Sequence, residues 1–180
     1  MKRRRSLVAA LVAAVALAVG CDPNVGQSGS PDEATMAVLG TARALHHQAD
    51  VYEGAGDYER AAQSIERVLA LPFPRGMAEA EDLRADAYGR LAEIALRAGA
   101  PDQALARANT GIADARRESV LRARLFMVRG QSLGALADRA GASGDANGAA
   151  QRRAEAITSL ETSIEINQRV LHRLVDGGAP

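Results

Sequence analysis

Two apolar patterns of helical spacing, separated by a short break, constrain the fold of this chain more than any other feature. The break, 54–57, contains two glycines and an aspartate. On both sides of it apolar residues recur every three or four positions, which places them on one face of a helix. They are Met36, Leu39, Ala42, Leu45, Ala49 and Tyr52 before the break, and Ala61, Ile65, Val68 and Leu69 after it. Residues 35–71 therefore predict an antiparallel helical hairpin.

Small residues mark the places where the two helices of a hairpin would cross, and they return twice along the chain. The pairs are Ala49 with Ala61, Ala92 with Ala104, and Gly130 with Ala156. A bulky side chain at such a crossing would overpack at a cost of about 1–3 kcal/mol. The first two pairs are separated by 12 residues and the third by 26. The excess predicts that each helix of the third hairpin is longer by about two turns.

The same period predicts the other helices and the loops between them. We expect helices over 77–98, from Pro101 to about Ile112, over 119–140 and over 149–176, with the loosest loop at 141–148. Proline is favoured at the first position of a helix because its missing amide is not needed there. Aromatic residues make up only 3% of the chain. A core of Ala, Leu, Ile and Val suits close helix packing better than a sheet.

The first hairpin carries the run Gly56-Asp57-Tyr58-Glu59-Arg60-Ala61-Ala62, followed by Leu71-Pro72. This run resembles the tetratricopeptide repeat, a helix–turn–helix unit of about 34 residues. The resemblance covers 41–167 and is strongest over 49–72. It implies an all-α fold, a right-handed α-solenoid of about three such hairpins over 35–176, with a long C-terminal capping helix.

The resemblance also implies a binding surface, because the first helices of such repeats line a concave face. The lining residues would be Arg43, His46, Asp50, Glu53, Asp86, Glu93, Leu96, Arg97, Arg124, Met127 and Gln131. Their mixed charges suggest a polar, peptide-like ligand, so the expected partner is a protein or peptide. The alternative is that these residues only form a solvated helix face.

The N-terminal residues are typical of a secretory signal. Residues 2–5 are basic, 7–19 are apolar, and Gly20 precedes Cys21. The run Leu17-Ala18-Val19-Gly20-Cys21 resembles the lipobox of bacterial lipoproteins. This resemblance implies a signal peptide over 1–20, a lipid on Cys21, and anchoring to the inner or outer membrane of a bacterial cell envelope. Residues 21–34 would then be a flexible tether and 177–180 a C-terminal tail. The alternative for Cys21, the only cysteine, is a lone cysteine near a cut site.

Charge and motif content exclude several classes of function. The chain has 22 basic and 22 acidic residues, and the signal removes four basic ones, which leaves 18 against 22. A mildly acidic surface argues against nucleic acid, which requires a dense basic patch. His46 and His47 point about 100° apart on a helix and do not form a chelate. We expect no metal, no cofactor and no enzymatic activity.

The last helix carries an apolar stripe that outlasts the repeat pattern. Its members are Ile157, Leu160, Ile164, Leu171 and Leu174, interrupted by Asn167. We expect the stripe to cap the stack, and the alternative is a contact with a second copy of the chain. The sequence thus favours a scaffold or adaptor lipoprotein. The alternatives are a self-associating structural subunit and a small envelope enzyme or solute-binding lipoprotein.

Overall fold

A computed structural model describes residues 31–177, which form six α-helices and, within that range, no strand. The helices are α1 (Pro31–Gly54), α2 (Tyr58–Leu69), α3 (Ala80–Arg97), α4 (Pro101–Asp114), α5 (Val120–Ala142) and α6 (Ala146–Val175). The predicted signal peptide and Cys21 lie outside the described residues, as do most of the tether and the last three residues. Among the described helices, none combines the length and apolar character needed to cross a bilayer.

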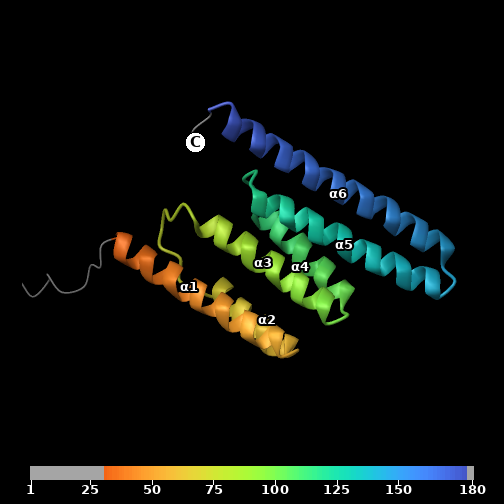
Figure 1. Cartoon of the computed structure of the whole chain (residues 1–180), viewed down its shortest axis with the longest axis horizontal. Coiled ribbons are helices and arrows are strands. Elements are labelled where there is room, and N and C mark those ends of the chain that lie inside the picture. Colours follow the sequence, from red (N-terminus) through yellow and green to blue (C-terminus); the bar gives the residue numbers. More distant parts are fainter. Residues whose placement is uncertain (1–30, 178–180) are drawn as a thin grey trace, which may run out of the picture.

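The helices pair into three successive hairpins, α1 with α2, α3 with α4, and α5 with α6 (Figure 1). Neighbouring hairpins stack through contacts of α2 with α3 and of α4 with α5, and α3 also packs on α5. Each hairpin therefore completes its core only by packing on the next one, as expected of a repeat architecture. The predicted all-α solenoid of helical hairpins is confirmed.

The turn of the first hairpin explains why the chain reverses at this point. Gly56 has a φ of 76°, a left-handed conformation that glycine adopts without strain. Asp57 then caps α2, because its Oδ1 accepts a hydrogen bond of 3.0 Å from the amide of Arg60. Ala49 and Ala61 are fully buried, as predicted for the crossing point of the two helices.

Three element boundaries differ from the sequence-based expectation. Helix α1 begins at Pro31 instead of Thr35, and Pro-Asp-Glu is a sequence typical of a helix start. Helix α3 begins at Ala80, three residues later than expected. The predicted loop 141–148 shrinks to the turn 143–145, because Asp145 caps α6 by accepting a hydrogen bond of 2.8 Å from the Gly148 amide.

The third hairpin is the longest, as the spacing of its crossing residues predicted. Helices α5 and α6 contain 23 and 30 residues, against 18 and 14 for α3 and α4. Figure 1 shows both helices extending past the rest of the stack. The extra turns keep the crossing of Gly130 and Ala156 in place, and both residues are buried.

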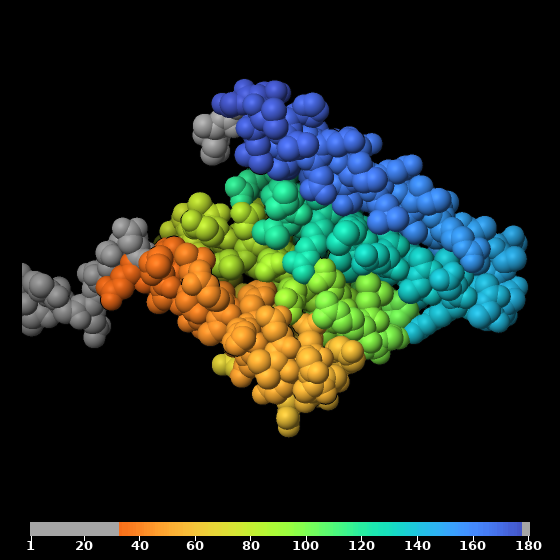
Figure 2. Space-filling model, viewed as in Figure 1, coloured from red at the N-terminus to blue at the C-terminus, as the bar shows by residue number. Residues whose placement is uncertain are grey.

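Helix α6 is the last helix of the stack, as predicted, but most of the apolar stripe expected to pack inward lies at the surface. Helix α6 turns a different face toward α5, and that face contains Ala149, Ala156, Ser159, Ser163 and Ile166. The Ser163 hydroxyl donates a hydrogen bond of 2.7 Å to the carbonyl oxygen of Ala123 on α5. The small residues of α6 pack against α5 because they let the two long helices approach closely. Leu160 lies beside Gly130 of α5, and the other members of the stripe are exposed on the helix that forms one edge of the molecule (Figure 2).

Candidate functional site

Helices α1, α3 and α5 carry the predicted binding residues, and ion pairs connect the three helices. Between α1 and α3, one guanidinium nitrogen of Arg90 lies 2.7 Å from Asp50 Oδ1 and 2.5 Å from Glu53 Oε1. Arg97 also pairs with Glu53. The Glu53 side chain is only 7% exposed, so its charge is committed to holding α1 against α3.

A second cluster connects α3 to α5. Arg124 forms a fork on Glu93, with Nε 2.8 Å from Oε1 and Nη2 2.7 Å from Oε2. Its Nη1 lies 2.5 Å from Asp86 Oδ1. The hydrogen bonds to Glu93 raise the pKa of the Arg124 guanidinium. A bidentate pair between half-buried groups fixes geometry as well as charge, so this cluster sets how α5 sits on α3.

His46 joins the second cluster from α1. Its Nε2 lies 3.5 Å from Asp86 Oδ2. Burial lowers the pKa of the imidazole, and the nearby Asp86 carboxylate offsets this effect only in part. Asp50, four residues after His46 on the same helix, is bound by Arg90. That bond lowers the pKa of the Asp50 carboxyl.

Sequence reasoning missed Arg90, the residue that holds α1 to α3. Its position contains the signal that could have found it. Arg90 lies four residues after Asp86 and three before Glu93, which puts all three on one face of α3. A cation placed between two acidic positions of the same face is well located to reach carboxylates on the neighbouring helix.

Five of the eleven predicted residues surround one hollow between α3 and α5. This α3–α5 hollow has a volume of about 320 Å³ and is lined by Glu93, Leu96, Arg97, Met127 and Gln131. It combines two apolar side chains with an amide and two charged groups. Of the remaining predicted residues, Arg43 is exposed and does not line the hollow, and the others belong to the two ion-pair clusters.

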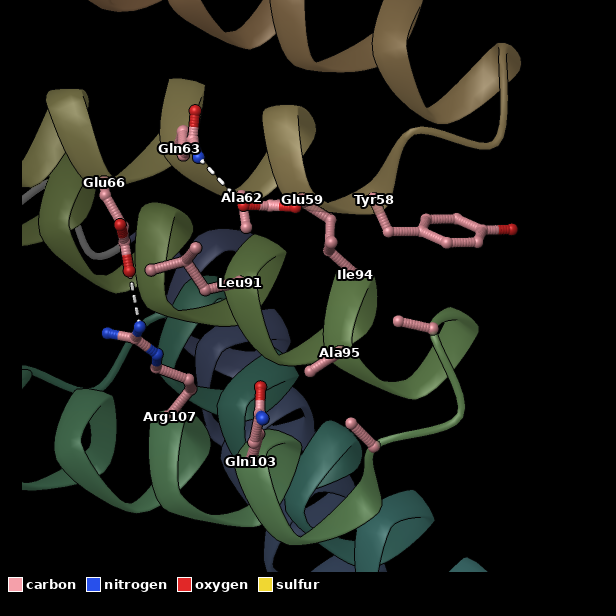
Figure 3. Close-up of a pocket in the computed structure, with 12 residues that line it drawn as sticks. Tyr58, Glu59, Ala62, Gln63, Glu66, Leu91, Ile94, Ala95, Gln103 and Arg107 are labelled. Carbon is pink, nitrogen blue, oxygen red and sulfur yellow. Dashed lines mark hydrogen bonds and ion pairs between the residues drawn. The ribbon is translucent and has the colours of Figure 1, made fainter.

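A larger pocket, of about 440 Å³, is lined by residues of α2, α3 and α4 (Figure 3). Leu91, Ile94 and Ala95 of α3 contribute its apolar floor. Arg107 on α4 closes one end by pairing with Glu66 on α2, with Nη2 and Oε1 2.5 Å apart. No sequence motif marks this pocket. It forms between α2 and α4, the second helices of the first two hairpins, which lie on either side of α3.

Among the described residues, no group of three or more His, Cys, Asp or Glu is placed to hold a metal ion. The charged side chains of α1, α3 and α5 instead pair with one another in opposite signs.

Comparison with known proteins bears on the first hairpin. A family model for the tetratricopeptide repeat matches 42–73, which spans the second half of α1, the turn and all of α2. Residues 42–73 form a tetratricopeptide repeat. No curated protein and no solved structure matches the chain. Repeats of this kind generally mediate binding to protein partners in non-enzymatic adaptors, so the repeat points to a protein-interaction scaffold.

Proposed function

We propose that this protein is a scaffold that binds a peptide segment of a partner protein in the α3–α5 hollow. The observation that carries the proposal is the gathering of five side chains from two helices around one hollow, within a stack that contains a tetratricopeptide repeat. A hollow of this size accommodates one or two side chains of a partner and not a whole domain.

The lining defines the chemistry of the bound segment. Leu96 and Met127 supply apolar contacts, and the flexible thioether of methionine adapts to differently shaped side chains. The Gln131 amide can donate to and accept from a peptide backbone. Arg97, whose side chain is 52% exposed, can bind a carboxylate at the rim. The ligand is therefore a segment with one apolar anchor and an adjacent acidic group.

The test is a crosslinking pull-down with the double variant Arg97→Glu, Met127→Glu. We expect this variant to lose the partners that the native protein retrieves, because it reverses the rim charge and buries a carboxylate against the apolar anchor. A matched control, Arg75→Glu with Val51→Glu, makes the same charge change at two exposed positions outside the hollow. Exposed substitutions usually change stability by less than about 0.5 kcal/mol, so the control should melt close to the native protein. Arg97→Glu also removes the ion pair with Glu53, so the hollow variant should melt lower, and the pull-down is done at a temperature at which both variants are folded. Retrieval of the native set of partners by the hollow variant would contradict the proposal.

We further propose that the scaffold is anchored by a lipid on Cys21 to a membrane of a bacterial cell envelope. The support is the basic, apolar and lipobox-like order of residues 1–21. Two or more acyl chains would hold the protein at the membrane stably, whereas one chain binds only marginally.

Labelling with palmitate tests the anchor. The native chain should incorporate the label and Cys21→Ser should not, and its precursor should remain uncleaved. Ser28→Ala, a change of similar size in the adjoining segment, serves as the control and should be labelled like the native chain. Equal labelling of Cys21→Ser and the native chain would rule out the lipid anchor.

A further inference from the structure

Helix α6 exposes a continuous apolar stripe along its outer face. The exposed fractions are 56% for Ile157, 37% for Leu160, 56% for Ile164, 61% for Leu171 and 71% for Leu174. Monomeric soluble proteins rarely expose a contiguous apolar patch larger than a few hundred Å². An uncovered face of this length therefore calls for an occupant.

The other two hairpins show what such a face receives. The residues four positions after the crossing residues Ala61, Ala104 and Ala156 are Ile65, Ala108 and Leu160. Ile65 and Ala108 are fully buried. The cluster of Ile65 contains residues of α1 and Leu91 of α3, and that of Ala108 contains residues of α3 and Val128 of α5. In α2 and α4, the helix face that contains this position thus contacts the helix that follows in the chain. The stripe of α6 continues the same stacking interface, and among the described residues no helix follows to cover it.

The spacing of the stripe identifies the kind of helix that fits. With Asn167 included, its six positions are separated by 3, 4, 3, 4 and 3 residues, which is the a/d pattern of a coiled coil. Ile157, Ile164 and Leu171 stand at a positions, and Leu160, Asn167 and Leu174 at d positions.

The stripe is complementary to itself, since its spacing is the same when read in either direction. Two antiparallel copies of α6, related by a two-fold axis, place Ile157 opposite Leu174, Leu160 opposite Leu171 and Ile164 opposite Asn167. Beside the seam, Glu161 of one copy then meets Gln168 of the other. No like charges face one another, and a carboxylate meets an amide that can donate to it.

We infer that two copies of this chain associate through antiparallel pairing of their α6 stripes. The exposed aliphatic area of one stripe is on the order of 500 Å², so pairing two copies buries on the order of 1,000 Å², the size that a specific interface requires. The contact is isologous and closes as a dimer, which leaves the α3–α5 hollow of each copy free. This inference is independent of the proposed peptide-binding function.

Sedimentation equilibrium of the full chain at micromolar concentrations tests the pairing. We expect a dimer for the native chain and a monomer for Ile157→Glu with Ile164→Glu, because the dimer would bury four carboxylates in the seam. This change should weaken the dimer at least about a hundredfold. The matched control is Gln151→Glu with Thr158→Glu, which introduces the same residues at the same seven-residue spacing on the polar face of α6. It should remain a dimer.

A second measurement avoids any change to the stripe. A photocrosslinker at position 168, replacing Gln168, should yield a crosslinked dimer whose joined peptides contain Glu161. A monomeric native chain, an unaltered dimer in the stripe variant, or crosslinks only to other proteins would each overturn the inference. An open-ended series of oligomers would overturn it as well, since a two-fold contact closes after two copies.

Discussion

At the scale of single residues, the stack depends on places where two helices approach too closely for a side chain. Gly130 on α5 is such a place. A Cβ atom there would lie 2.8 Å from Leu160 Cγ and 3.0 Å from the carbonyl oxygen of Ala156, both on α6. The backbone oxygen cannot move without shifting α6, so the closeness of the third hairpin requires glycine at this position.

The variant Gly130→Ala should therefore lower the free energy of unfolding by about 1–3 kcal/mol, even though alanine is the better helix former. Gly134→Ala, one turn further along α5, is the matched control, because a Cβ atom there meets nothing within 4 Å. The control should be neutral or stabilise the protein by up to about 1 kcal/mol. Urea denaturation measures both, and a Gly130→Ala variant as stable as the control would show that α5 and α6 are further apart than described.

At the scale of elements, local signals predicted most of the fold. Gly56 and Asp57 mark the first turn, Pro101 begins α4 as expected, and the wider spacing of Gly130 and Ala156 correctly predicted a longer third hairpin. These features depend on neighbours in the sequence or on one helix crossing. They are therefore readable without knowing how the hairpins pack.

Features that depend on competition between distant groups could not be read in this way. Helix α6 has two faces that could pack inward, one of small residues and one of bulky residues. The sequence alone does not show that the small face packs on α5, with Leu160 of the bulky face at its border beside Gly130. Similarly, the eleven predicted binding residues were correctly assigned to α1, α3 and α5, but Asp86 and Glu93 proved to be held by Arg124. Such pairing depends on the spacing between helices, which periodicity does not give.

At the scale of the whole molecule, pairs of opposite charge hold the hairpins in register. Of the 22 basic residues in the chain, 18 follow the predicted signal peptide, and all 18 are arginines. Pairs connect α1 with α3 through Arg90, α3 with α5 through Arg124, and α2 with α4 through Arg107. Exposed pairs each contribute at most about 1 kcal/mol, so their joint effect lies mainly in fixing how one hairpin sits on the next. Protonation of the carboxylates would remove this effect and leave the arginines to repel one another.

The stability of the protein should consequently fall on acidification, first through His46. This imidazole faces Asp86 and Arg90 on α3, Asp50 on its own helix and Arg124 on α5, and burial lowers its pKa below the usual value. At a pH between the two pKa values, His46 is therefore protonated in the unfolded chain and neutral in the folded chain. The contribution of His46 to the free energy of unfolding is fully present above about pH 6.5 and is lost as the pH falls through the lower folded-state pKa.

Carboxylates add a second loss of the same sign at lower pH. Arg90 lowers the pKa of Asp50, the Arg117 amide that of Glu81, and Arg169 that of Glu118. The contributions of these three carboxylates to the free energy of unfolding are present above about pH 4 and are lost below it. Urea denaturation at pH 8, 6, 5, 4, 3 and 2 should show both losses, the first between pH 7 and 5 and the second below about pH 4. His46→Gln should flatten the profile between pH 7 and 5, because it removes the buried group that must take up a proton. His47→Gln, at the neighbouring exposed position, should keep the native profile. If instead the native protein gained stability between pH 7 and 5, His46 would be held by Asp86 as a cation, and the balance between burial and charge at this site would be the reverse of that described.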